Sequence, residues 1–265
     1  MSFQPVLPLT GYAGWRFLQR TLDTQQAHHS QSPNQTRLAE HFRANAPAVH
    51  SATEFVEDRQ LMEVALSAFG LQDDLGAKAF VRRILESNPS DETSLVNRLA
   101  DKRYLQFANA FGFGSGFANM RLPGAAENIV KKFESKSFEM AVGEQDNSLR
   151  IALSSQSELN MILSENRTEN ARWYAIMGNP PLRELFQTAF GFPSAMAQID
   201  VEQQLVQFKE RASSVFGTSD LSKIAVGANY EKLTRLYLAR DELASSSAYQ
   251  SGQVALALLQ SSGSL

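Results

Sequence analysis

Three segments in which apolar residues recur at helical spacing each run into the tripeptide Ala-Phe-Gly, and this pattern constrains the fold more than any other feature. Apolar residues that lead into each tripeptide, and reach its first or second residue, occupy positions i, i+3, i+4 and i+7, which is the spacing of one face of an α-helix. The three sets are Leu61, Val64, Ala65 and Ala68; Tyr104, Phe107, Ala108 and Phe111; and Leu182, Leu185, Phe186 and Ala189. Alternating, β-branched stretches of strand length are hard to find. The sequence therefore predicts an all-α, multihelical single domain.

The glycine of each tripeptide is predicted to end its helix. Helices often end with glycine at C′, where φ is positive, and the next apolar residue then folds back onto the last turn. Leu71, Phe113 and Phe192 follow the three glycines and are apolar. A ligand-binding loop would explain the glycine but not this apolar residue. The predicted structural helix stops are Phe69, Gly70, Phe111, Gly112, Phe190 and Gly191.

Because a further helical segment follows each stop, the chain shows a weak internal duplication of helix, stop and helix units. No Ala-Phe-Gly occurs near residue 151, where an evenly spaced repeat would place one. We therefore interpret the pattern as a pseudo-duplication and not as a solenoid.

Composition divides the chain into three predicted parts. Residues 1–50 hold all four histidines and a polar run from Asp23 to Thr36, and we expect them to form a peripheral N-terminal arm on a flexible link. Residues 51–248 are predicted to form the helical body. Residues 249–265 are predicted to be a Ser-rich tail that contains one apolar patch, Val254 to Leu259.

Charge and cysteine usage exclude several classes of partner. The net charge of -3 provides no basic surface for a phosphate backbone, so no nucleic acid is expected. The chain has no cysteine, which removes thiol nucleophiles, disulfides and thiolate metal sites. The longest purely apolar runs fall far short of the ~20 residues of a membrane helix, so no membrane insertion is expected. No secretory signal is recognisable at the N-terminus, so we expect a cytoplasmic protein, or one exported without a cleaved signal peptide.

No catalytic, cofactor-binding or metal-binding motif is predicted. The stretch Gly112 to Phe117, GFGSGF, lacks the spacing, the preceding strand and the lysine of a phosphate-binding loop. The four histidines have none of the three- or four-residue spacings that place two ligands on one helix face, so we interpret them as solvated. Asp73 and Asp74 are either paired carboxylates for acid–base or cation chemistry or, as we favour, charges at a helix N-terminus. Asp101 is interpreted as a helix cap or as the partner of a basic neighbour.

Four stretches in order carry a family resemblance: ALSAFGLQDDLGAKAFVRRILES, TSLVNRLADKRYLQFANAFGF, GEQDNSLRIAL and LRELFQTAFGFPSAM. Their most specific parts are the Ala-Phe-Gly stops, the helix with A-K-A-F, the D-x-R-Y junction at Asp101 to Tyr104, and G-E-Q near Gly143. From about Phe55 to about Ala228 the chain resembles the bacterial family known as domain of unknown function 1217.

The resemblance implies an all-helical domain without established enzymatic activity, encoded by genes that commonly lie among flagellar genes. It supplies no catalytic residue to transfer. The matching positions are Phe69, Gly70, Lys78, Phe80, Arg103, Tyr104, Phe111 and Gly112. They are interpreted as packing and capping residues, except for the charged Lys78 and Arg103. The candidates for a contact or ion-pair role are Lys78, Asp101, Arg103 and Tyr104.

Three functional hypotheses remain at the level of sequence. The first is a non-enzymatic, flagellum-associated structural or assembly protein that binds other proteins. The second is a cytoplasmic export chaperone or regulator whose C-terminal VALALL patch makes a helix-in-groove contact with flagellar proteins. The third, an enzyme that uses Asp73, Asp74 or the histidines, lacks a matched constellation.

Overall fold

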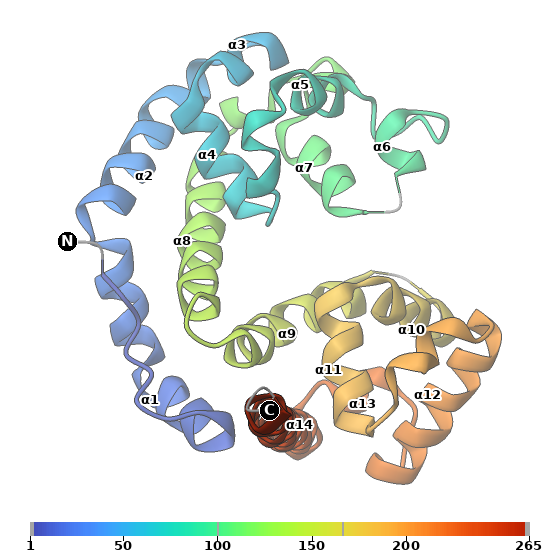
Figure 1. The fold of residues 1–265 in the computed structure, drawn as a ribbon. Helices are drawn as coiled ribbons and strands as arrows, with labels where there is room; N and C mark the ends of the chain where they lie inside the picture. The colour runs from blue at the N-terminus through green and yellow to red at the C-terminus, as the bar shows by residue number, and fades with distance from the viewer. Residues whose placement is uncertain (1–2, 100, 166, 263–265) are drawn as a thin grey trace. The chain divides into compact units, whose positions relative to one another are not determined.

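The structure is a computed structural model that describes residues 3–99, 101–165 and 167–262, with side chains described as far as residue 246 (Figure 1). Over these residues it contains fourteen α-helices and no strand, and 78% of the chain is helical. The predicted all-α class is therefore confirmed, while the internal duplication stays a prediction. Backbone contacts divide the chain into two compact units. Unit 1 comprises Met1–Val6 and Thr21–Ala141, and unit 2 comprises Leu7–Arg20 and Val142–Leu265.

Unit 1 holds the C-terminal part of the first helix and the helices that follow it. Its α-helices are α1 (Gly11–Ser30, shared with unit 2), α2 (Pro33–Asn45), α3 (Ala52–Glu57), α4 (Arg59–Ala68), α5 (Lys78–Glu86), α6 (Leu95–Arg98), α7 (Arg103–Phe111) and α8 (Ala125–Gly143, whose last two residues belong to unit 2). Four 3-10 turns connect them: η1 (Ala46–Ala48), η2 (Gln72–Gly76), η3 (Phe113–Ser115) and η4 (Asn119–Arg121).

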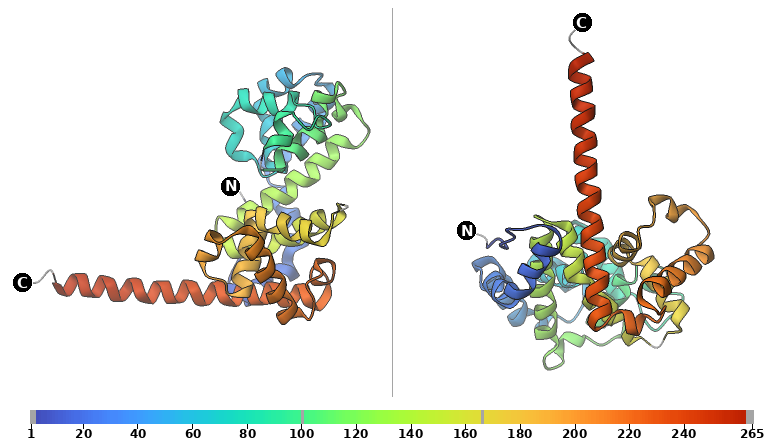
Figure 2. Two further views of the ribbon diagram at one scale, coloured as in Figure 1. Left: turned by 90° about the vertical axis from the view of Figure 1, so that its right-hand side faces the viewer. Right: turned by 90° about the horizontal axis from the view of Figure 1, so that it is seen from below.

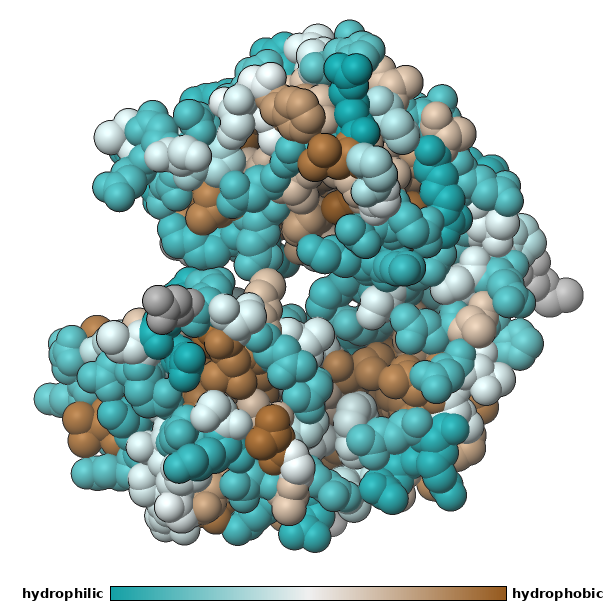
Figure 3. All heavy atoms as spheres, turned by 180° about the vertical axis from the view of Figure 1, so that it is seen from behind, coloured by the Kyte–Doolittle hydropathy of each residue, from teal (hydrophilic) through white to brown (hydrophobic). Residues whose placement is uncertain are grey.

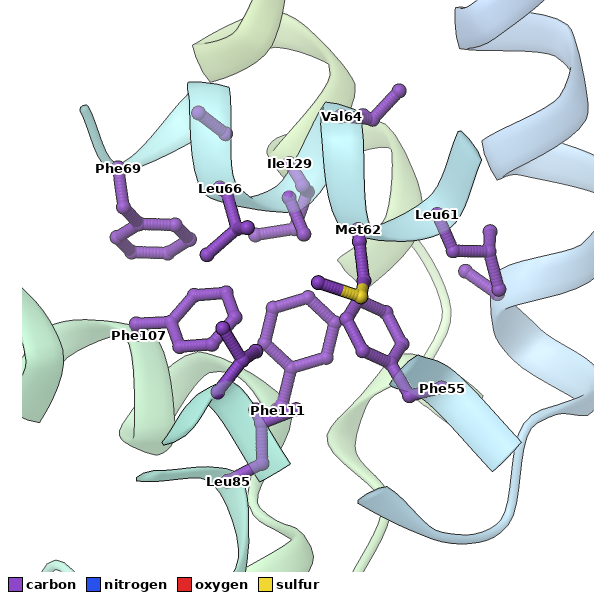
Figure 4. Packing of buried hydrophobic residues seen from close by; sticks show 14 of the residues in the cluster. Phe55, Leu61, Met62, Val64, Leu66, Phe69, Leu85, Phe107, Phe111 and Ile129 are labelled. Atoms are coloured by element: carbon purple, nitrogen blue, oxygen red, sulfur yellow. The ribbon is translucent and has the colours of Figure 1, made fainter. Parts of the chain in front are cut away.

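Aromatic rings from three helices form the centre of unit 1 (Figure 4). Phe55 of α3 lies 4.8 Å from Phe111 of α7, measured between ring centroids, and Phe111 lies 5.1 Å from Phe107. Phe69, at the end of α4, meets Phe107 edge to face at 5.5 Å. All four rings are buried. Tilted and edge-to-face rings at these separations add specific attraction to the burial of their area, so the stop residues Phe69 and Phe111 are part of the core.

The N-terminal residues differ from the predicted peripheral arm. Helix α1 continues through most of the polar run, and the side chain of Gln25 accepts a 2.7 Å hydrogen bond from Val6 N and donates to Val6 O. Leu38 and Phe42 of α2 are buried in the core cluster of unit 1. The composition of the polar run does not reveal this packing, because its amide and imidazole side chains form hydrogen bonds within the unit, as His29 does with Ser137. Residues 1 and 2 of the predicted arm lie outside the described residues.

Unit 2 begins with the N-terminal part of α1 and is completed by the second half of the chain. Its remaining helices are α9 (Asn147–Ser164), α10 (Glu169–Gly178), α11 (Pro180–Phe190), η5 (Ser194–Gln198), α12 (Val201–Phe216), α13 (Leu221–Ile224) and α14 (Gly227–Ser262).

Trp173 of α10 is the largest fully buried side chain of unit 2. Its ring meets Phe186 of α11 edge to face at 5.4 Å, and its Nε1 donates a 3.0 Å hydrogen bond to Ser219 O. Phe190 extends the aromatic contacts from Phe186 to Phe208 of α12. The indole therefore fills the core while its one polar atom is satisfied.

Helix α14 continues beyond residue 248, where the helical body was predicted to end. It begins at Gly227 and continues to Ser262, so the segment predicted as a Ser-rich tail is helical as far as it is described; residues 263–265 of that tail lie outside the described residues. No proline follows Pro193 in the sequence, and a single glycine, Gly252, costs stability without stopping the helix. Nothing in the local sequence therefore ends α14 at residue 248.

Candidate functional site

Helix α4 ends at Gly70 in a Schellman motif. Gly70 has φ +68°, its N–H binds Ser67 O at 3.0 Å, and Leu71 N–H binds Leu66 O at 2.8 Å. These two bonds satisfy carbonyl groups that the end of a helix leaves open, and the positive φ explains why the residue is glycine.

The D-x-R-Y junction binds this helix end. Arg103, the first residue of α7, donates through Nη1 to Gly70 O and through Nη2 to Asp101 Oδ2 at 2.7 Å. Asp101 Oδ1 also accepts the backbone N–H of Arg103 at 2.9 Å. Burial acts to raise the pKa of Asp101, but the hydrogen bonds from Arg103 outweigh it and hold that pKa below its ordinary value. Two separate sequence motifs therefore meet in one polar contact.

Tyr104 adds a bond from α7 to the 3-10 turn η2, which follows Gly70. Its hydroxyl donates a 2.7 Å hydrogen bond to Asp74 Oδ2 in η2, and its ring lies 5.3 Å from Phe80 of α5. Burial, followed by the charge and hydrogen bond of Asp74, raises the pKa of Tyr104 to about 12. Asp73 and Asp74 lie in the first turn of η2, so their charges are at a helix N-terminus as expected, but no side chain caps η2. Asp74 instead accepts a hydrogen bond from the Tyr104 hydroxyl.

Lys78 lies away from this polar contact. Its Nζ is 3.3 Å from Glu57 Oε2, and both side chains are largely solvent-exposed. Exposed pairs of this kind contribute little because water screens the charges and the side chains lose rotamer freedom. The structure thus brings Asp101, Arg103 and Tyr104 together with Gly70 and leaves Lys78 in a separate surface pair.

The third helix stop, Gly191, resembles the first in its bonding. Phe192 N–H binds Gln187 O at 3.0 Å, and φ of Gly191 is +71°. Arg240 of α14 donates a 2.7 Å hydrogen bond to Ala189 O. An arginine from another helix therefore binds a carbonyl oxygen at the stop of α11, as Arg103 does at the stop of α4.

Close backbone packing explains the glycines of the GFGSGF loop. Gly112 ends α7 with φ +72°, and a Cβ at Gly114 would lie 2.1 Å from the carbonyl oxygen of Ser87. Asn119 Nδ2 closes the loop on Asn109 O at 2.8 Å. These glycines allow the close approach of two backbones, which accounts for them without a phosphate.

The histidines lie in separate surroundings. His41 Nε2 donates a 2.7 Å hydrogen bond to Asp58 Oδ2, and Asp58 also caps α4 by accepting from Gln60 N and Leu61 N. His29 is buried against the ring of Phe138. Within the described parts of the chain, no group of three or more His, Asp or Glu side chains is arranged to hold a metal ion.

A buried tyrosine among carboxylates lies where α14 packs on α9 and α11. Tyr237 is fully buried, and its hydroxyl has no hydrogen-bond partner among the described residues. Burial, then the charges of Glu184, Asp241 and Asp146, raises its pKa. Burial and the charge of Asp241 also raise the pKa of Glu184. Sequence reasoning missed this cluster: Tyr237 and Asp241 are one helical turn apart, but nothing local indicates Asp146 or Glu184.

The C-terminal half of α14 extends beyond the other helices of unit 2, as both views of Figure 2 show. The packed part of the helix contains buried Leu233, Tyr237 and Leu238, whereas Leu243 is 68% exposed. No helix among the described residues combines the length and the apolar character required to cross a membrane. We call residues 243–262 the α14 extension.

Other exposed hydrophobic residues are scattered over both units. They include Phe117 and Leu122 in the loop before α8, and Val201, Val206 and Val226 in unit 2. The face drawn in Figure 3 is largely hydrophilic, with hydrophobic residues in separate groups. Such isolated residues are normal for a protein surface, so the α14 extension remains the most distinctive surface feature.

These features define an all-helical protein whose conspicuous polar residues bind within the fold. The chain belongs to the family described as "Protein of unknown function (DUF1217)", whose model matches residues 68–225. That range begins in the first Ala-Phe-Gly stop, includes the D-x-R-Y junction and ends before α14.

Comparison with solved structures shows a similar fold in protein AGR_C_984 from Agrobacterium tumefaciens. The crystal structure of that protein matches with a TM-score of 0.68 and 23% sequence identity, over 88% of this chain and 97% of that chain. At this identity the similarity establishes the fold alone. Comparison with curated proteins found no match.

Proposed function

We propose that this protein is a non-enzymatic, flagellum-associated structural or assembly protein that acts by contacting other proteins. The observation that carries the proposal is the α14 extension, a helix that continues past the body of its unit to Ser262. A helix that extends from a packed base presents its sides to partners, and helices of this kind are common elements of protein–protein recognition.

The use of the polar residues also favours a contact role. Within unit 1, Arg103 of the D-x-R-Y motif binds Gly70 and Asp101, and Tyr104 of the same motif binds Asp74. Their hydrogen-bonding groups thereby hold helix ends in place. The flagellar setting comes from the family resemblance, whose genes commonly lie among flagellar genes.

The location of the protein tests this proposal. The chain would be detected with antibody in cytoplasm, culture supernatant and purified hook-basal bodies, in an export-competent strain and in one that lacks the flagellar export ATPase. We expect it outside the cell, or in hook-basal bodies, only when export works. Retention in the cytoplasm of both strains would contradict the proposal and favour the export chaperone or regulator, whose client would then be sought by pull-down.

Two matched variants connect the location to the α14 extension. The double variant Leu256→Glu, Leu259→Glu places two charges in its apolar patch. The control Val201→Glu, Val206→Glu places the same two charges at exposed apolar positions of α12. We expect the first variant to be lost from hook-basal bodies and the second to remain.

A further inference from the structure

The α14 extension carries no charge. All 25 lysines and arginines and all 28 aspartates and glutamates precede Leu243, and all four histidines lie within the first 50 residues. From Leu243 to the C-terminal residue the sequence contains only apolar, small and neutral polar residues, mainly Ser, Ala, Leu and Gln. A partner recognised through ion pairs would find no side-chain charge to bind here.

The extension is also unlike a solvated single helix. Val254 to Leu259 is a run of six apolar residues, which spans more than one and a half turns and therefore places apolar positions on every side of the helix axis. A helix that is apolar all round is normally buried by neighbours. Ser245, Ser246, Ser247 and Gly252 have low helix propensity, so packing must supply the stability that the local sequence does not.

We infer that the α14 extension is a self-association element that packs against the same segment of other copies of this chain. The inference rests on the proposed function in one respect, that α14 is the contact element, and it specifies the partner as a second copy.

Charge is the argument for a second copy over a different protein. Charged residues flanking an apolar seam set which helices pair, through attraction between opposite charges and repulsion between like charges. The extension has none, so copies meet without like-charge repulsion in either a parallel or an antiparallel arrangement. Its serines and glutamines are both donors and acceptors, so each copy offers what the other requires. The small residues, Ser, Ala and Gly, allow the backbones of packed helices to approach closely.

The mass of the full-length chain in solution tests the inference. Sedimentation equilibrium over a range of concentrations should give a dimer or larger oligomer that dissociates on dilution. Leu256→Glu, Leu259→Glu should convert it to monomer at concentrations where Val201→Glu, Val206→Glu remains associated. Helical circular dichroism and the melting temperature of each variant establish that unit 2 is still folded. A wild-type chain that is monomeric throughout would overturn the inference.

Crosslinking locates the contact, because the chain has no cysteine of its own. Ala257→Cys introduces one thiol into the apolar patch, and Ser214→Cys introduces one at an exposed position of α12. Oxidation of the first variant should give a covalent dimer at concentrations where the second stays monomeric. Equal dimer formation by both thiols would show random collision and would contradict the inference.

The failure of this inference can be distinguished from the failure of the proposed function. Suppose that the wild-type chain is monomeric and that Leu256→Glu, Leu259→Glu still removes it from hook-basal bodies. The extension would then bind a different protein. That result would overturn self-association and leave the proposed function intact. An oligomeric chain that never leaves the cytoplasm would overturn the proposed function and leave self-association intact.

Discussion

Arg103 donates a hydrogen bond from its guanidinium to the carbonyl oxygen of Gly70, the glycine that ends helix α4. The two residues are 33 positions apart in the sequence and belong to two different family motifs. Asp101, which precedes α7, binds the other edge of the same guanidinium and so fixes the orientation of the arginine side chain. The relationship joins the end of one helix to the start of another.

Arg103→Ala should lower the free energy of unfolding by about 1–2 kcal/mol, because it leaves Asp101 and the helix-end carbonyl without their charged donor. Chemical denaturation measures the change. Arg82→Ala is the matched control: this arginine has an exposed i,i+4 partner, Glu86, at 3.7 Å, and its loss should cost less than about 0.5 kcal/mol. Equal losses for the two variants would show that the contact with Gly70 adds nothing.

Alanine substitutions at glycines should have different costs according to their surroundings. Gly70→Ala should cost roughly 1 kcal/mol, because φ is +68° and the nearest atom, Arg103 Nη1, is 3.3 Å from the new Cβ. Gly112→Ala should cost clearly more, since its Cβ would lie 2.5 Å from the backbone oxygen of Phe117. Gly178→Ala, which meets nothing within 4 Å and has no positive φ, should be neutral or slightly stabilising. Thermal melts give the order, and a Gly70→Ala midpoint equal to wild type would refute the strain argument.

Asp58 is predicted to make unit 1 sensitive to acid. Burial acts to raise the pKa of its carboxyl, but the hydrogen bonds from His41, Leu61 and Gln60 outweigh it and lower the pKa below its ordinary value. A lowered folded-state pKa means that the stabilisation is present above the unfolded value of about 3.9 and is lost as the pH falls through the folded value.

Asp58→Asn keeps a capping oxygen and removes the charge, so at pH 7 it should be less stable than wild type by about 0.5–1 kcal/mol. Urea denaturation at a series of pH values should show this difference shrinking once the pH falls below about 4. A difference that is constant with pH would show that the charge of Asp58 is not its source.

Two tyrosines of α14 should respond oppositely to loss of the hydroxyl. Tyr230→Phe removes a 2.8 Å hydrogen bond with the buried Ser155 hydroxyl and should cost about 1 kcal/mol. Tyr237→Phe removes a buried hydroxyl that has no partner among the described residues, and it should be neutral or stabilising by up to about 1 kcal/mol. Thermal denaturation of the pair measures both effects. A loss at Tyr237 as large as that at Tyr230 would indicate a bound water or another partner at this hydroxyl.

Local signals explain which parts of the fold could be predicted from the sequence. The end of α11 is encoded by Gly191 and an apolar C″ residue, and its start by Asn179, whose side chain accepts from Leu182 N, with Pro180 at the first helical position. Each signal lies within a few residues of the feature it determines.

The parts that could not be predicted depend on contacts distant in the sequence. The polar run after Asp23 is helical because Gln25 and His29 find partners within unit 1, which composition does not reveal. The bond between Arg103 and Gly70 joins residues 33 positions apart, and neither motif on its own indicates that they meet. For α14, serine content suggested a tail, whereas helix continuation depends on the absence of proline and on what packs against it.

Because the backbone of α14 is unbroken, a small change of angle where the helix packs moves its far end by a much larger distance. Its 36 residues correspond to a rod of about 54 Å, of which the α14 extension accounts for about 30 Å. A tilt of ~5° at the base, where Tyr237 packs against α9 and α11, would move the far end by about 3 Å. A rearrangement too small to disturb the core can therefore displace the far end of the helix by about the length of a hydrogen bond. The packing beside Asp241 thus determines how precisely the end of α14 is positioned.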